Sequence, residues 1–154
     1  MAITVGAPAP DFTLPAEPGG DITLSALRGK PVVLYFYPKD STPGCTTEAC
    51  DFRDRMERLQ AKGAVVLGVS RDSLRRHANF REKHGLNFPL LTDEDGALHQ
   101  QYGAWGEKKL YGKVSIGPIR STVLIDADGV VRQHWPKVRV KGHADAVLEA
   151  LEAL

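Results

Sequence analysis

Apolar runs recur along the chain and alternate with segments that have the periodicity of helices. Two runs, Val32–Tyr37 and Ala64–Ser70, are almost uniformly apolar and rich in strand-favouring residues, which is typical of central strands covered on both faces. Shorter runs at Leu90–Thr92, Ser121–Ile125 and Val130–Trp135 predict further strands. With helices between them, these strands indicate an α/β fold whose sheet contains parallel strands.

Apolar positions at helical spacing predict the helices. One stripe, with spacings of four, three, four and three, consists of Cys45, Ala49, Phe52, Met56 and Leu59. This stripe predicts a helix that ends at Lys62-Gly63. A second helix, capped by Asp72 or Ser73, should run towards His84-Gly85, and a short one should cover about residues 97–102. The last helix has an apolar side made of Ala144, Val147, Leu148, Leu151 and Leu154.

The first part of the chain predicts a small hairpin ahead of the main sheet. Its strands are expected at Phe12–Leu14 and Asp21–Leu24, and the linker Pro15–Gly20 has the composition of a turn and should not continue a strand. A brief helical turn is expected at Ser25–Arg28, and the Gly-rich, aromatic stretch Gly103–Pro118 is interpreted as a loop. This order of elements predicts a thioredoxin-like fold with an N-terminal β-hairpin extension and a central mixed sheet flanked by helices. Residues 1–154 are expected to form one domain.

Composition narrows the possible functions. The formal net charge is +1 with both signs mixed along the chain, so no basic surface for nucleic acid is indicated. Neither a signal peptide nor a segment of transmembrane length is apparent, so the expected location is cytoplasmic, without membrane partners. In that reducing compartment a cysteine pair is more often catalytic, redox-active or metal-binding than structural.

Cys45 occupies a position that favours reactivity. With Thr42 as N-cap and Pro43 at the first helical position, Cys45 becomes the third residue of a helix that follows a buried strand. Unpaired backbone N–H groups and the positive end of the helix dipole favour a thiolate there. The chain therefore predicts a thiol nucleophile in a partly closed pocket, although an inert core cysteine is the common alternative.

Cys50, the only other cysteine, lies five residues further along the same predicted helix. Ideal helix geometry places the two Cα atoms about 8.6 Å apart, whereas a disulfide requires about 7 Å or less. A Cys45–Cys50 bond would therefore require the first turns of the helix to unwind. Taken alone, Cys50 could also be an inert residue.

Several segments together resemble one known family. The pattern Pro38-x-x-x-Thr42-x-x-Cys45 resembles the active-site motif of the peroxiredoxins, and residues 44–50 are similar to the Q-type branch, also called bacterioferritin comigratory proteins. The likeness covers essentially the whole chain. It includes the segments Gly6–Phe12, Arg120–Asp126 and Val140–His143.

The resemblance implies a role for each residue of the motif. It implies that Cys45 is the peroxidatic cysteine, which is oxidised to a sulfenic acid, and that Cys50 is the resolving partner. It also implies that Thr42 orients the peroxide, Pro38 shields the pocket and Arg120 is the cation beside the sulfur. A guanidinium suits the last role because it stays charged and can contact sulfur and oxygen together.

The same resemblance implies substrates, partners and assembly. Hydrogen peroxide and alkyl hydroperoxides are the expected substrates, thioredoxin or a glutaredoxin-like dithiol is the expected reductant, and the protein is expected to be a monomer. No metal, flavin or haem is required. A peroxide-sensing redox protein on the same fold is the alternative, and steady turnover would distinguish the two. A thioredoxin-type reductase would need Cys-x-x-Cys, and cluster or zinc sites would need more ligands than this sequence groups together.

The aromatic residues near the Gly-rich stretch and the histidines are also considered as functional residues. Tyr102, Trp105 and Tyr111 could wall a hydrophobic mouth for organic hydroperoxides, or could pack a loop against the core. The histidines show no close ligand spacing and are expected to be exposed or hydrogen-bonded, outside the catalytic set. They are His77, His84, His99, His134 and His143.

Overall fold

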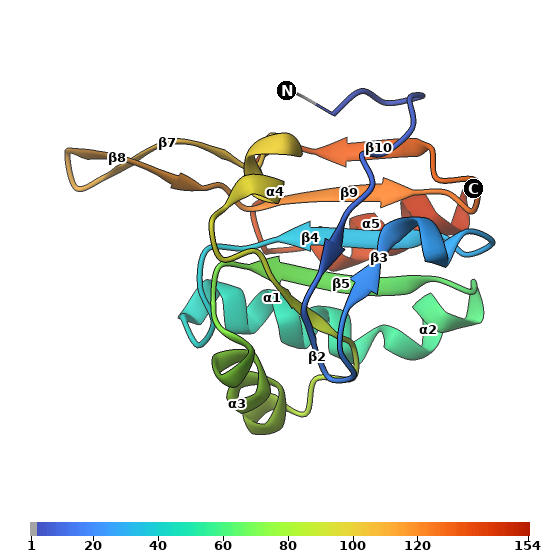
Figure 1. The fold of residues 1–154 in the computed structure, drawn as a ribbon, viewed down its shortest axis with the longest axis horizontal. Helices are drawn as coiled ribbons and strands as arrows, with labels where there is room; N and C mark the ends of the chain where they lie inside the picture. The colour runs from blue at the N-terminus through green and yellow to red at the C-terminus, as the bar shows by residue number, and fades with distance from the viewer. Residues whose placement is uncertain (1–2) are drawn as a thin grey trace.

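A six-stranded mixed sheet forms the centre of the structure, a computed structural model that describes residues 3–154 (Figure 1). The strand order is β10-β9-β4-β5-β6-β2. These strands are β2 (Ala16–Glu17), β4 (Val32–Phe36), β5 (Val65–Ser70), β6 (Leu90–Thr92), β9 (Ser121–Ile125) and β10 (Val131–Trp135). Met1 and Ala2, which belong to the predicted domain 1–154, lie outside the described residues.

Strand β4 lies in the middle of this sheet, as its apolar sequence predicts. It pairs in parallel with β5, where Val32 is opposite Val65, and antiparallel with β9, where Val33 is opposite Leu124. Every residue of β4 is buried. Strands β4, β5 and β6 run parallel, whereas β2, β9 and β10 are antiparallel to their neighbours. The predicted mixed sheet of a thioredoxin-like fold is confirmed.

The helices agree with the predicted periodicity except at one break. They are α1 (Pro43–Asp54), α2 (Met56–Ala61), α3 (Leu74–His84), α4 (Ala97–Gln101) and α5 (His143–Glu152). The prediction of one helix up to Lys62-Gly63 is wrong, because Arg55 leaves the helical conformation and divides it into α1 and α2. The backbone N–H of Arg55 bonds to the carbonyl of Phe52, and its guanidinium donates to the carbonyl of Asp51.

The structure shows which residue caps α3 and where the apolar side of α5 ends. Ser73 is the N-cap of α3 and accepts a hydrogen bond from the backbone N–H of Arg76, and Gly85 ends the helix in the left-handed conformation. Asp72 is therefore not the cap. Leu154 does not belong to the buried side of α5, because the helix ends at Glu152 and Leu154 is 46% exposed.

The predicted N-terminal hairpin is present, but the linker between its strands contains a strand of its own. Strands β1 (Thr13–Leu14) and β3 (Ile22–Thr23) pair antiparallel, and the 3-10 helix η1 (Leu24–Leu27) follows. The linker contains β2, which pairs with the edge of β6, so the prediction of a linker without a strand is wrong. Pairing with a preformed edge overrides the turn-like local composition.

The stretch Gly103–Pro118 is a β-ribbon and not the predicted loop. Strands β7 (Trp105–Leu110) and β8 (Lys113–Pro118) pair antiparallel and project from one end of the molecule (Figure 1). Tyr111 and Gly112 connect them, with φ of 52° and 77°. Two successive positive φ angles are the mark of the tight turn that matches the twist of a hairpin.

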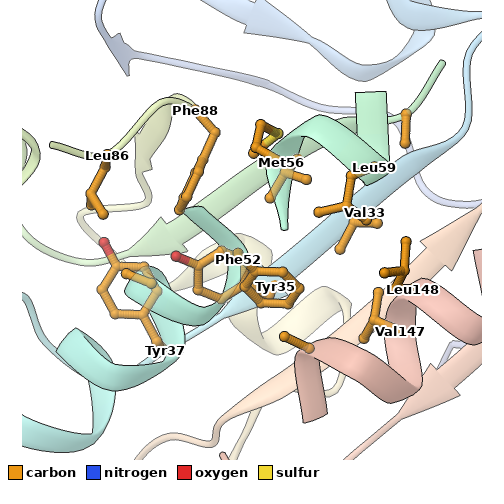
Figure 2. Close-up of a cluster of buried hydrophobic side chains, with 14 of the residues drawn as sticks. Val33, Tyr35, Tyr37, Phe52, Met56, Leu59, Leu86, Phe88, Val147 and Leu148 are labelled. Carbon is orange, nitrogen blue, oxygen red and sulfur yellow. The ribbon is translucent and has the colours of Figure 1, made fainter. Parts of the chain in front are cut away.

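Alternation along β4 divides the core into two clusters on opposite faces of the sheet. Val33, Tyr35 and Tyr37 point to the cluster beneath α1, α2 and α5, where the ring of Tyr35 packs at a tilt against Phe52 of α1 (Figure 2). The residues between them point to the other cluster, which includes Tyr102. Cys45 belongs to the first cluster, so the thiol lies on the α1 side of the sheet. Within residues 3–154, no helix combines the length and apolarity needed to cross a membrane.

Candidate active site

The first turn of α1 holds Cys45 where the sequence predicts it. Thr42 is the N-cap, Pro43 opens the helix, and the backbone carbonyl of Thr42 accepts from the N–H of Thr46. The Thr42 hydroxyl does not cap the helix but donates to the carbonyl of Lys39 at 2.8 Å. The sulfur of Cys45 therefore lies in the electropositive first turn of α1. Because Cys45 is 2% exposed, the sulfur has little contact with water.

Arg120 connects the sulfur to a buried carboxyl group. Its Nη2 donates to Cys45 Sγ at 3.3 Å, and its Nη1 donates to Glu48 Oε1 at 2.7 Å. Arg120 directly precedes β9, and β9 pairs with β4, so the sheet itself fixes the guanidinium beside α1. Gly44 leaves it room, because a Cβ at that position would lie 3.2 Å from Nη2.

Glu48 is a site residue that sequence analysis missed. Its side chain is 1% exposed, and Oε2 has no hydrogen-bond partner among the described residues. Burial raises the pKa of Glu48 to about 7, although the neighbouring charge of Arg120 lowers it in part. The available signal was its spacing, since residue 48 follows Cys45 by three positions and therefore shares the buried face of the helix.

Glu48→Gln is expected to change how stability depends on pH. Between pH 4.5 and about 7 the unfolded chain has ionised residue 48 while the folded chain retains the proton, so wild-type stability falls as pH rises through this window. The variant lacks this titration. The free energy of unfolding of E48Q relative to wild type should therefore increase by about 3 kcal/mol across the window, as measured by urea denaturation.

His143 also makes stability depend on pH, in the opposite direction, and comparing E48Q with wild type cancels its effect. Burial and the charge of Arg120 lower the pKa of His143 to about 4, which makes stability rise with pH from about 4 to 6.5 in both proteins. A difference between E48Q and wild type that stays constant with pH would contradict the buried, protonated state of Glu48.

Two further groups lie near enough to Cys45 for its charge to affect them, and both were also missed. The buried hydroxyl of Tyr35 has no partner among residues 3–154, and burial together with the negative charges of Glu48 and Cys45 raises its pKa. Lys108, from β7, is half-buried. Burial lowers the pKa of Lys108, whereas a negative charge on Cys45 raises it. The ribbon therefore brings a second cation towards the thiol.

Pro38 lies at the mouth of the site. Together with Arg120 it lines a cavity of about 220 Å³, whose other walls are Lys108, Ile119, Lys137 and Val138. The mouth therefore combines apolar side chains with cations. An uncharged or anionic peroxide with an apolar substituent matches this lining better than a cationic molecule does.

Cys50 is half-buried and reduced, and it lies in the same unbroken helix as Cys45. The structure therefore does not bring the two thiols together. Because ideal helix geometry separates the Cα atoms by about 8.6 Å, a bond between them requires α1 to open.

The aromatic residues of the predicted mouth have different locations. Tyr102 is fully buried in the opposite cluster, and its hydroxyl donates to the carbonyl of Pro10. Trp105 packs beneath Arg71, whose guanidinium carbon lies 5.6 Å from the ring centre. Both residues therefore pack and do not wall the mouth. Tyr111 is 96% exposed at the ribbon tip, so neither interpretation holds for it.

Three of the histidines are buried and hydrogen-bonded. His77 bonds to Asp40, His99 to Asp93, and His143 to Thr122. His134 differs, because its buried Nε2 has no partner within the described part of the chain. Among residues 3–154 no three His, Cys, Asp or Glu side chains are grouped as metal ligands would be.

A thioredoxin-like sheet that presents a buried cysteine at a helix start, against an arginine, defines a thiol-based redox protein. Residues 5–134 match the AhpC/TSA family. The chain is 50% identical over 151 residues to a putative peroxiredoxin Bcp of Coxiella burnetii, covering 98% of this chain and 100% of the relative. It is 49% identical over 154 residues to peroxiredoxin Bcp of Bacillus subtilis, covering 100% and 96%.

Solved structures agree with the sequence relatives. A structure of peroxiredoxin Q from Xanthomonas campestris superimposes with a TM-score of 0.87 at 50% identity, covering 92% of this chain and 90% of that chain. A mutant of PrxQ from Xylella fastidiosa gives a TM-score of 0.92 at 37% identity, covering 98% and 96%. The chain therefore belongs to the AhpC/TSA family and is a peroxiredoxin, a thiol-dependent peroxidase.

Proposed function

We propose that Cys45 is the peroxidatic cysteine of this enzyme, with Arg120 and Thr42 as the groups that act on the bound peroxide. The observation that carries the proposal is the position of Arg120, which contacts both Cys45 Sγ and the buried Glu48 at the start of α1. A fixed cation at this point stabilises the thiolate and faces the oxygen that develops negative charge.

In the first step the Cys45 thiolate attacks one peroxide oxygen. The S–O bond forms as the O–O bond breaks, and the departing oxygen takes a proton and leaves as water or alcohol. Cys45 is then a sulfenic acid. Thr42 orients the peroxide through its hydroxyl, Pro38 covers the pocket, and Arg120 stabilises the charge on the departing oxygen.

In the second step Cys50 resolves the sulfenic acid. Its thiolate attacks the Cys45 sulfur, the S–S bond forms, and the oxygen leaves as water. Because both residues lie in α1, this step follows unwinding of the first turns of the helix. The disulfide protects Cys45 from further oxidation, and exchange with a dithiol returns both thiols.

The proposal extends to substrates, reductant and setting. Hydrogen peroxide and alkyl hydroperoxides are the substrates, and the cavity beside Pro38 supports the second class. The bacterioferritin comigratory protein of Xanthomonas campestris, which is 49% identical, has alkyl peroxide reduction activity. Thioredoxin or a glutaredoxin-like dithiol is the reductant, and the enzyme works as a cytoplasmic monomer of one domain, residues 1–154.

A coupled assay tests this function. The protein, thioredoxin, thioredoxin reductase and NADPH are mixed with hydrogen peroxide or cumene hydroperoxide, and NADPH oxidation is followed. Many turnovers per molecule are expected for wild type and none for Cys45→Ser. A single turnover in wild type would instead indicate a peroxide sensor, and equal activity in the variant would overturn the role of Cys45.

A further inference from the structure

The loop between β4 and α1 is anchored by a buried carboxylate that has no assigned role. Asp40 is 5% exposed, and its Oδ2 lies 2.6 Å from His77 Nδ1 on α3. Its Oδ1 accepts from the hydroxyl of Tyr37, and its backbone N–H donates to Asp72 Oδ2 at 2.8 Å. Asp40 is therefore held by α3 and by the segments that directly follow β4 and β5.

The contacts of His77 determine how many protons the pair carries. Its Nε2 lies 3.0 Å from the backbone carbonyl of Leu91, which can only accept, so Nε2 carries a hydrogen. A neutral ring with that hydrogen would present a bare lone pair from Nδ1 to the Asp40 carboxylate at 2.6 Å. A further proton must therefore lie between Nδ1 and Oδ2, held by the ring or by the carboxyl group.

The polar groups around the pair have partners of their own. Tyr37, directly after β4, donates to Asp40, and Asp72, after β5, accepts from the hydroxyl of Ser70. Arg76 of α3 lies 3.6 Å from the other oxygen of Asp72. With its proton the Asp40–His77 pair is neutral overall, and the neighbouring Asp72 has its own cation.

The anchored loop carries residues of the proposed active site. Asp40 is two residues from Pro38 and two from Thr42. Ser41, between Asp40 and Thr42, has a φ of 64°, a left-handed conformation that costs free energy for a residue other than glycine. Such a conformation persists only where the surroundings impose it, and the bonds of Asp40 do so here.

We propose that Asp40 and His77 are positioning residues for peroxide reduction, and that the hydrogen bond between them, which their shared proton makes possible, fixes the loop that places Pro38 and Thr42 over Cys45. This inference rests on the proposed function and adds to it a structural support outside the peroxide pocket. Neither residue touches the reacting atoms. Their effect is on the geometry that the peroxide meets.

Matched variants at one position separate the hydrogen bonds from the charge. In Asp40→Asn the amide can donate to His77 Nδ1 and its oxygen can accept from Tyr37, so the loop keeps both bonds without the shared proton. Asp40→Leu keeps neither bond. In stopped-flow oxidation of Cys45 by hydrogen peroxide, D40N should react at close to the wild-type rate, whereas D40L should be slower by about tenfold to a hundredfold.

A spectroscopic measurement stands apart from activity and from the folding of any variant. In wild-type protein labelled with ¹⁵N-histidine, Nδ1 of His77 should show the shift of a protonated or hydrogen-bonded nitrogen, together with a far-downfield proton. The shift of a free lone pair on Nδ1 would overturn the inference.

The kinetic outcomes are equally decisive. A folded D40L that reacts as fast as wild type, or a D40N as slow as D40L, would overturn the inference. Should D40L fail to fold, His77→Leu, which removes the same hydrogen bond from the other side, takes its place in the rate measurement and should be slower than D40N. If wild-type Cys45 itself does not react with peroxide, the proposed function fails, and the histidine spectrum still reports on the shared proton.

Discussion

Replacing Arg120 by lysine is expected to slow the oxidation of Cys45 by hydrogen peroxide by about a hundredfold, as measured by stopped-flow fluorescence at pH 7. The guanidinium donates from one nitrogen to Cys45 Sγ and from another to Glu48 Oε1. A lysine has a single nitrogen on a flexible stem and cannot reproduce this fork. Its charge would remain, but the direction of its hydrogen bonds would not.

The expected size of this loss separates two roles of Arg120. A thiol with a pKa of about 8.5 is already roughly 3% ionised at pH 7, so full ionisation contributes only about thirtyfold. A larger loss must come from the peroxide itself, through poorer alignment and weaker stabilisation of the departing oxygen. A loss of this size would therefore assign Arg120 a part in both thiolate formation and peroxide activation.

Arg132→Lys is the matched control for this experiment. Arg132 pairs with Asp126 at 3.3 Å and is half-exposed, so the substitution makes the same chemical change at an ordinary surface ion pair. Its rate of Cys45 oxidation should equal that of wild type. A mild loss in Arg120→Lys, well below thirtyfold, would contradict the role given to the guanidinium.

Cys50→Ser is expected to abolish turnover with thioredoxin while leaving the first oxidation step at the wild-type rate. The serine hydroxyl cannot form a disulfide, so the Cys45 sulfenic acid has no internal partner. The hydrogen bonds of Arg120 go to Glu48 and Cys45 and do not involve Cys50, so the site around Cys45 should stay intact. The two rates are measured by NADPH-coupled turnover and by single-turnover stopped flow.

Excess peroxide adds a second expectation for this variant. Without disulfide formation the sulfenic acid is open to further attack, so sulfinic acid should accumulate at Cys45 faster than in wild type. Thr46→Ser, which makes a conservative change in the same helix, should behave as wild type in both assays. Undiminished turnover by Cys50→Ser would show that the reductant reacts directly with the sulfenic acid, and would remove Cys50 from the mechanism.

The fold was predictable wherever local pattern and tertiary environment agree. The uniformly apolar β4 could only be a covered central strand, and Thr42-Pro43 marks the start of α1 through local chemistry. The ribbon β7–β8 was missed because its glycines and exposed polar residues carry no core pattern. Strand β2 was missed because it depends on the edge that β6 offers.

In the proposed active site, too, residues with local sequence signals could be predicted, whereas those placed by tertiary structure could not. Cys45 could be recognised from its neighbours in sequence, since helix start, N-cap and small residue are all local signals. Arg120 and Lys108 reach it from distant strands, and no spacing in the sequence distinguishes them from other basic residues. Arg120 was identified only through family resemblance. Glu48 had a helical spacing signal, but burial of its charge depends on the tertiary partner Arg120.

The most direct test of the central claim is to identify which sulfur receives the first oxygen. Reduced wild-type protein and Cys50→Ser are each treated with one equivalent of hydrogen peroxide, alkylated, digested and analysed by mass spectrometry. We expect a Cys45–Cys50 disulfide in wild type and a sulfenic acid confined to Cys45 in the variant. Unmodified Cys45 in both proteins, with its thiol still free after peroxide, would contradict the central claim.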